Sequence, residues 1–206
     1  MITPLSTASA PAQADAIFVH ACCGPCSIMP VQRLRDMGFA PTLYFYNPNI
    51  HPLMEYLRRR DALLEVAARL DVPVLLPDQA DPDLAHPGPW LAAVTPLGEG
   101  MDDLAQRCPL CYALRLGPAA KAAADLGFTR FTSTLLYSKY QNHEAILAAG
   151  AAAAKQIGIE FVGEDFRPGW SEGQRLAREW GVYRQPYCGC MLSEHERYRS
   201  KLACRH

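Results

Sequence analysis

The chain alternates between short apolar runs and longer segments in which apolar residues recur every three or four positions. Five short runs are rich in β-branched and aromatic residues, which is typical of buried strands. These predicted strands lie within residues 16–20, 41–50, 72–77, 130–136 and 159–165.

The segments between these runs have the spacing of amphipathic helices. Predicted helices cover residues 27–38, 52–71, 101–115, 118–127, 142–158 and 171–181, with a short one around 90–94 and a last one near the end of the chain. Ser27, Asn142 and Ser171 are the expected N-caps, because their side chains can accept hydrogen bonds from the first turn.

Strands that alternate with helices predict βαβ units. We therefore expect an α/β fold, with a mostly parallel sheet and helices on both faces. Residues 16–206 are expected to form one domain, and residues 1–15 a disordered lead-in. In such sheets the site lies beyond the carboxyl ends of the strands, where Cys22 and Cys23 directly follow the first strand.

The composition narrows the class of protein. With 206 residues, 50% hydrophobic and 20% charged, the chain can build a core without disulfides. Its first residues lack the features of a signal peptide, and no apolar run reaches the length of a membrane span. We therefore expect a cytoplasmic protein with no membrane partner. In that compartment eight cysteines indicate metal or redox chemistry.

Charge is unevenly distributed although the net charge is only -1. From Arg167 to His206, eight Lys and Arg residues stand against four Glu. A basic segment of this kind could face phosphate, or it could form solvated helix faces, and the charge pattern alone leaves both open.

Seven of the eight cysteines fall into three groups. The groups are Cys22, Cys23 and Cys26; Cys108 and Cys111; and Cys188 and Cys190. The spacing C-x-x-C places two sulfurs on one side of a turn, which suits either a metal site or a dithiol redox pair. Two such pairs supply enough thiolates for zinc or for a [4Fe–4S] cluster. Adjacent cysteines more readily reach two corners of an iron–sulfur cube, which favours a cluster over a structural zinc.

The pair Cys188 and Cys190 is a different case. A C-x-C disulfide closes a very small ring, which would be strained and easily reduced, and Gly189 helps the backbone to accommodate it. The pair is therefore either a redox-active dithiol, a second metal site or two ligands of the same zinc. Cys204 is assigned no role.

Polar residues also follow the predicted strands. His51, His143 and Asp165 lie in strings that combine aromatic and hydrogen-bonding side chains, which suits a flat ligand such as a nucleobase. Asp165 could donate a proton or bind a metal, or it could cap the next helix. No glycine-rich phosphate motif is present.

Several long motifs occur together and in order. They read "HACCGPC", "YFYNPNIHPLMEYLRR", "RCPLCYALRL", "FTSTLLYSKYQNHE", "EDFRPGWSEG" and "YRQPYCGCMLSE". In these motifs the chain resembles, from about residue 16 to residue 196, the cobalamin-independent epoxyqueuosine reductases of the QueH type. The resemblance implies a fold of the adenine-nucleotide-hydrolase-like (PP-loop) group. It also implies reduction of epoxyqueuosine in tRNA to queuosine, the last step of that modification.

The same resemblance implies roles for individual cysteines. Cys22, Cys23, Cys108 and Cys111 would hold a [4Fe–4S] cluster, and Cys188 and Cys190 would form a redox-active disulfide pair. A further iron ion would lie beside the cluster, with Cys26 as a candidate ligand.

Removing an epoxide oxygen as water consumes two electrons and two protons. A cluster usually passes one electron at a time, so an iron or a dithiol must supply the second equivalent. We expect His143 or Asp165 to relay a proton, and the electron donor is not identified by the sequence. Two alternatives remain: a zinc-stabilised RNA-binding module, and a PP-loop enzyme that modifies tRNA. The latter needs an S-G-G-x-D-S loop where this chain reads "ACCGPCS".

Overall fold

The computed structural model describes residues 15–202, so Cys204 and nearly all of the expected lead-in lie outside the described residues. Its centre is a five-stranded sheet in which all the paired strands are parallel, in the order β3-β2-β1-β4-β5. The strands are β1 (Ala16–His20), β2 (Ala40–Tyr44), β3 (Val74–Leu75), β4 (Arg130–Ser133) and β5 (Glu160–Phe161). The predicted α/β fold with a parallel sheet is confirmed.

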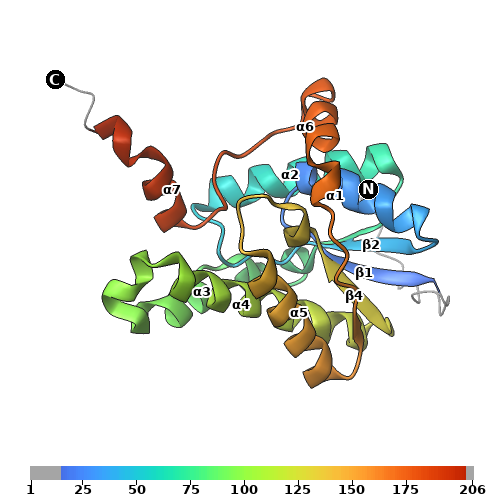
Figure 1. The fold of residues 1–206 in the computed structure, drawn as a ribbon, viewed down its shortest axis with the longest axis horizontal. Helices are drawn as coiled ribbons and strands as arrows, with labels where there is room; N and C mark the ends of the chain where they lie inside the picture. Colours follow the sequence, from blue (N-terminus) through green and yellow to red (C-terminus); the bar gives the residue numbers. More distant parts are fainter. Residues whose placement is uncertain (1–14, 203–206) are drawn as a thin grey trace.

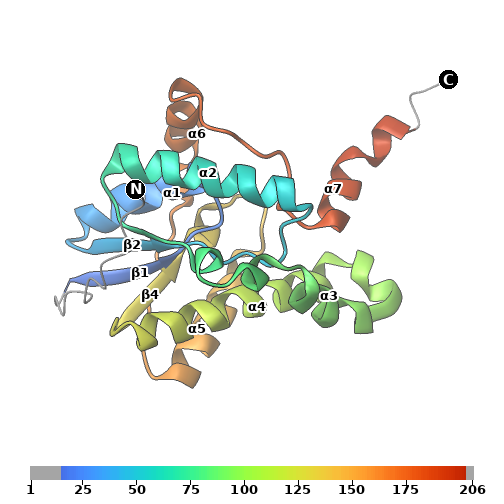
Figure 2. The same ribbon diagram turned by 180° about the vertical axis from the view of Figure 1, so that it is seen from behind.

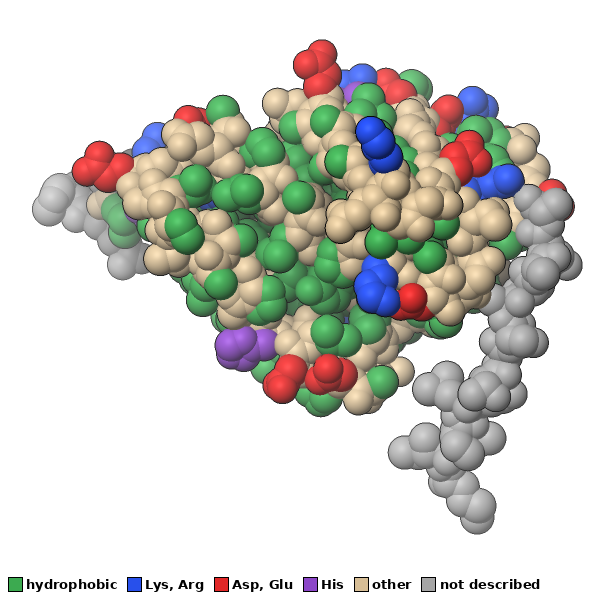
Figure 3. All heavy atoms as spheres, turned by 90° about the horizontal axis from the view of Figure 1, so that it is seen from below, with side chains coloured by type: hydrophobic (Ala, Val, Ile, Leu, Met, Phe, Trp, Pro, Cys, Tyr) green, Lys and Arg blue, Asp and Glu red, His purple; other side chains and the backbone are tan. Residues whose placement is uncertain are grey.

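Helices cover both faces of this sheet, as predicted (Figure 1 and Figure 2). They are α1 (Gly24–Asp36), α2 (Leu53–Leu70), α3 (Gly88–Val94), α4 (Leu104–Asp125), α5 (His143–Ile157), α6 (Trp170–Glu179) and α7 (Met191–Tyr198). Helices α1, α2 and α6 lie on one face and α4 and α5 on the other, while α7 projects away from the sheet (Figure 1). From below, Lys and Arg side chains are scattered over the surface, and several of them lie beside Asp or Glu side chains (Figure 3).

Strand β1 determines where the segment that follows it lies in the sheet. All five of its residues are buried, and it pairs with β2 on one side and with β4 on the other. The chain order therefore reverses between β1 and β4, which is where ligands bind in open parallel sheets. His20 and Ser133 are neighbours in this register, so the segments after β1 and β4 lie side by side.

Two of the three predicted N-caps are wrong. Helix α1 begins at Gly24, and Ser27 lies inside it, where its hydroxyl donates to Cys23 O at 2.9 Å. Helix α6 begins at Trp170 with Gly169 as its N-cap, so Ser171 is not the cap. Asn142 is confirmed as the N-cap of α5, because its side chain accepts from the Ala145 N–H at 3.0 Å.

The two helices expected over 101–115 and 118–127 are one continuous helix, α4. It contains Pro109 and Pro118, each of which lacks a backbone N–H and disfavours a helix interior. Tertiary packing outweighs that cost, since Leu116 and Ala120 of the same helix are fully buried in the main core.

Three predicted strands are shorter than expected. Strands β3 and β5 have only two residues each, and they lie at the two edges of the sheet. The predicted strand over 130–136 ends at Ser133, and residues Thr134–Tyr137 form a 3-10 turn. Within the described part of the chain, no helix has the length and apolar character that crossing a membrane would require.

Candidate metal centre

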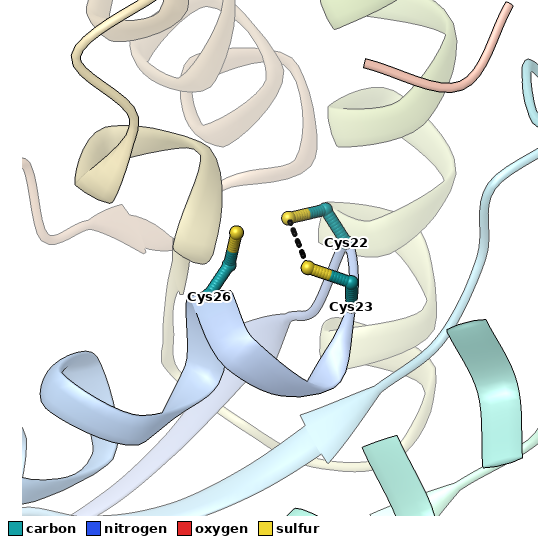
Figure 4. Close-up of side chains that lie close together, drawn as sticks. All are labelled: Cys22, Cys23 and Cys26. Atoms are coloured by element: carbon teal, nitrogen blue, oxygen red, sulfur yellow. Dashed lines mark hydrogen bonds between the residues drawn. The ribbon is translucent and has the colours of Figure 1, made fainter. Parts of the chain in front are cut away.

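Three thiols meet directly after β1, at the start of α1. The Sγ atoms of Cys22, Cys23 and Cys26 all lie within 4.8 Å of one another, and those of Cys22 and Cys23 are 3.8 Å apart (Figure 4). Cys22 and Cys23 are buried, and Cys26 is half-buried. The three side chains point toward a common centre (Figure 4), so this group could bind a metal.

Gly24 allows this arrangement. Cys23 is the N-cap of α1, and Gly24 is its first residue. A Cβ at position 24 would clash with the backbone oxygen of Ala62 in α2. Because backbone cannot swing aside as a side chain can, only glycine lets α1 lie this close to α2 with the thiols at its first turn.

Neighbouring polar groups hold the thiols in place. The hydroxyl of Thr134 accepts from the Cys22 backbone N–H at 3.0 Å and lies 3.3 Å from Cys22 Sγ. Gln185 donates from Nε2 to Cys23 Sγ at 2.9 Å. The hydrogen bonds with Cys23 and Cys26 hold the pKa of Cys22 well below its usual range, whereas burial raises the pKa of Cys23 to about 12. The group therefore favours one thiolate, the form that binds metals.

The second cysteine pair lies on α4. Cys108 and Cys111 are separated by almost one helical turn, and Arg115 follows one turn later on the same face. Cys108 packs against the same hydrophobic core as the first cysteine group, and Cys111 packs against Trp90 and Cys190. Burial raises the pKa of Cys111 to about 11.

The third pair follows a loop that leads into α7. Cys188 and Cys190 are both free, and their sulfurs are 3.9 Å apart, well beyond the ~2.05 Å of a covalent S–S bond. The expected disulfide is therefore absent, and the pair is a dithiol. The hydrogen bond with Cys190, followed by that with Ser193, lowers the pKa of the exposed Cys188 to about 5.

Helix α2 anchors this third segment through Arg59, which is 1% exposed. Arg59 donates to Cys188 O at 2.9 Å and to Tyr187 O at 3.2 Å, and it forms an ion pair with the buried Glu55 at 2.7 Å. Gly189 has a φ of 127°, which side-chain-bearing residues rarely adopt, and its carbonyl accepts from the His51 N–H at 2.9 Å. Arg59 thus has a structural role, because it attaches the third cysteine segment to α2.

The other predicted site residues lie in different surroundings. Asp165 forms an ion pair with Arg167 at 2.7 Å, and Arg167 lowers its pKa to about 2. It is therefore ionised at neutral pH and can accept a proton but not donate one. His143 begins α5 and has a buried Nδ1 without a hydrogen-bond partner. His51 is buried, and its ring centroid lies 5.1 Å from that of Trp90. Neither of its ring nitrogens has a hydrogen-bond partner.

The structure brings the sulfurs of one predicted cysteine group together, and the other predicted site residues lie outside this group. Cys22, Cys23 and Cys26 are the compact group of three among residues 15–202, and Cys108 and Cys111 are not part of it. The assignment of Cys22, Cys23, Cys108 and Cys111 to one cluster stays a prediction, as do the roles of His143 and Asp165. Sequence reasoning missed Thr134 as a partner of Cys22, and it missed Arg115, whose spacing of four and seven residues from Cys111 and Cys108 is a helical signal.

The donor set fits an iron–sulfur group. Soft thiolates are its usual ligands, and seven free cysteines lie in three segments of the described chain. Arg115 is 2% exposed and its Nε has no hydrogen-bond partner, so the site also contains a buried positive charge that a negatively charged thiolate-ligated group would balance.

Fold and site together define an α/β protein whose cysteine-rich centre occupies the switch point of a parallel sheet. The family model for "Epoxyqueuosine reductase QueH" matches residues 17–196. This chain belongs to the epoxyqueuosine reductase QueH family, and it is an oxidoreductase.

Individual relatives agree with the family match. The QueH protein of Thermotoga maritima is 36% identical over 186 residues, which cover 88% of this chain and 91% of the relative. That of Dehalococcoides mccartyi is 32% identical over 185 residues, covering 90% and 96%. A solved structure, described as a predicted subunit of tRNA methyltransferase from Methanocaldococcus jannaschii, has a TM-score of 0.50 at 14% identity and covers 79% of this chain and 75% of its own. That likeness concerns the fold alone.

Proposed function

We propose that this protein reduces epoxyqueuosine in tRNA to queuosine with a [4Fe–4S] cluster held by Cys22, Cys23, Cys108 and Cys111. Cys26 is the proposed ligand of one additional iron ion. The observation that carries the proposal is the group of three thiols within 4.8 Å of one another at the switch point of the sheet, in a chain of the QueH family.

The bound cluster would supply single electrons, and the additional iron a Lewis acid for the epoxide oxygen. The protein's own residues supply the remaining electrons and one of the protons of the reaction. Reduction of an epoxide to an alkene consumes two electrons and two protons and releases water. Oxidation of the Cys188 thiolate and the Cys190 thiol to a disulfide releases two electrons and one proton, so the pair provides the electrons for one turnover and the second proton must come from solvent. An external electron donor then returns the disulfide to the dithiol.

The low pKa of Cys188 supports this role. A thiolate is the nucleophilic and reducing form of cysteine, and Cys188 with a pKa of about 5 is ionised at neutral pH. The two sulfurs need to approach by about 2 Å to form a bond. The segment can make this movement because Cys188 is exposed and Gly189 lies between the two cysteines.

Proton delivery is proposed to involve His143, with Asp165 as its partner. His143 has a free buried Nδ1, and the Asp165 carboxylate interacts electrostatically with it. Imidazole has both a donor and an acceptor nitrogen, so it can pass a proton from one side of the ring to the other.

The tRNA is proposed to contact the basic C-terminal segment. Part of the positive charge there is neutralised, because Arg167 pairs with Asp165 and Arg175 pairs with Glu172 and Glu179. Other basic side chains have no carboxylate within 4 Å among residues 15–202 and could neutralise phosphate. They are Arg178, Arg184, Arg197, Arg199 and Lys201.

Anaerobic purification, iron and sulfide analysis, and turnover of tRNA that contains epoxyqueuosine test the proposal together. We expect brown protein whose absorbance near ~400 nm bleaches with dithionite. Cys108→Ala should lose both the cluster and turnover. Cys204→Ala, which removes the cysteine assigned no role, should keep both. A colourless and active Cys108→Ala variant would contradict the proposed cluster. Colourless wild-type protein with stoichiometric zinc would instead favour a zinc-stabilised RNA-binding module.

A further inference from the structure

A buried arginine lies between the cysteine segments without a carboxylate partner. Arg115 of α4 is 2% exposed, and no carboxylate lies within 4 Å of it among residues 15–202. Its hydrogen bond goes to a neutral amide, Asn47 Oδ1, at 2.7 Å, and its Nε has no partner. Burying a positive charge without a nearby carboxylate costs roughly several kcal/mol of folding free energy. A negatively charged group in the site must therefore balance it.

The other buried arginines differ from Arg115 in this respect. Arg59 pairs with Glu55 at 2.7 Å, and Arg107 pairs with Glu196 at 2.8 Å. Both have a carboxylate that neutralises them locally. Arg115 alone among these three has only neutral hydrogen-bonding partners in the described structure.

The position of Arg115 links it to two of the cysteine segments. It lies four residues after Cys111 and seven after Cys108, so the three side chains share one face of α4. Its partner Asn47 donates from Nδ2 to Ala21 O at 3.0 Å, and Ala21 directly precedes Cys22. Arg115 is therefore linked by two hydrogen bonds to the first cysteine segment and by its own helix to the second.

The positive charge of Arg115 also interacts electrostatically with Cys22, Cys111 and Cys188, which is one thiol in each of the three cysteine groups.

We propose that Arg115 is the built-in counter-charge of the thiolate-bound iron–sulfur cluster and that it raises the reduction potential of this cluster. The inference rests on the proposed function, because it requires a cluster at these cysteines. Reduction adds one negative charge to the cluster, and a fixed cation in a buried site stabilises the reduced state more than the oxidised one. Arg115 is thus a positioning and tuning residue, and it does not contact the reacting atoms.

The test is an EPR-monitored redox titration of cluster-loaded, substrate-free protein with dithionite. Arg115→Gln should shift the one-electron reduction equilibrium by about tenfold toward the oxidised state, which corresponds to a potential lowered by ~59 mV. Arg115→Lys should keep the potential of the wild type. Lys121→Gln is the matched control: it removes one positive charge from the same helix, but this charge is exposed and paired with Asp125 at 2.6 Å, so the potential should not move.

Each result decides between charge and other roles. A cluster-loaded Arg115→Gln protein with the wild-type reduction potential overturns the inference. If KM for tRNA rises in that protein while the potential is unchanged, Arg115 is assigned to substrate binding instead. Loss of iron and sulfide in Arg115→Gln with retention in Arg115→Lys supports the inference, whereas loss in both overturns it. Wild-type protein without iron and sulfide refutes the proposed function itself, so the two failures are distinguishable.

Discussion

The first and third cysteine segments hold their sulfurs at similar separations by different means. Cys22 and Cys23 are 3.8 Å apart, and Cys188 and Cys190 are 3.9 Å apart. The first pair is buried between a core strand and the first turn of α1. The third pair lies in a loop that is attached by the side chain of Arg59 and by a backbone hydrogen bond to Gly189.

This difference separates a static site from a movable one. Backbone packing around Gly24 leaves the first segment no room to change its geometry, which suits ligands that keep a metal group in place. The third segment is held by a few polar contacts and contains an exposed thiol, which suits a pair that must alternate between a dithiol and a disulfide. The following variants test this contrast, from the largest expected effect to the smallest.

Removing the anchor of the third segment should have the largest effect. Arg59→Met leaves Glu55 buried without a positive partner, and we expect the free energy of unfolding to fall by about 3–5 kcal/mol. The double variant Arg59→Met/Glu55→Met removes both charges and should recover part of this loss. Urea denaturation of all three proteins measures the effect. Equal stability of the single variant and the wild type would show that the ion pair does not hold this segment.

Crowding the first segment should have the next largest effect. Gly24→Ala forces α1 away from α2, because its Cβ would clash with Ala62 O, and we expect a loss of about 2–3 kcal/mol together with lower iron incorporation. Gly117→Ala is the matched control, since a Cβ there meets nothing within 4 Å and alanine favours the interior of α4. If both variants bind iron as the wild type does, the first segment is not rigid.

A smaller effect is expected at the side-chain support of Cys22. Thr134→Val removes the acceptor of the Cys22 N–H and should lower the free energy of unfolding by about 1–2 kcal/mol. Thr134→Ser keeps the hydroxyl and should keep most of the stability. Thermal unfolding of the metal-free protein compares the two. Identical behaviour of the Val and Ser variants would mean that this hydrogen bond adds nothing.

The last prediction concerns reactivity and leaves stability unchanged. In metal-free protein, alkylation of Cys188 by iodoacetamide should be fast at neutral pH and slow only as the pH falls through about 5, because its pKa is lowered and the thiolate persists down to that value. Cys190→Ala removes the main cause and should move this transition to higher pH. Mass spectrometry of the labelled peptide gives the rates. A transition of Cys188 near pH 8–9 in both proteins would show that its thiol is ordinary.

The sequence predicted the fold better than the site. Hydrophobic periodicity was sufficient for the parallel α/β sheet, because each strand and helix carries its own local pattern. It failed at Pro118, where long-range packing of α4 outweighs a local signal, and at Ser27 and Ser171, where another residue takes the N-cap.

The site could be predicted only as groups of residues close in sequence. The spacing of Cys22, Cys23 and Cys26 indicated a common site because neighbours on a tight turn lie close in any fold. Contacts between distant segments, such as Arg59 with Cys188 or Asn47 with Arg115, depend on how the helices pack, and no local pattern encodes them.

The continuity of α4 across its two prolines limits how the chain can vary in length. In a helix each residue turns the next by about 100°. One residue inserted between Cys111 and Arg115 would therefore rotate Arg115 off the face that carries Cys108 and Cys111, although every original residue would still be present. The exposed stretch 79–83, which precedes α3, has no such phase to keep. Insertions and deletions are thus tolerable there, while the interval from Cys108 to Arg115 has a fixed length.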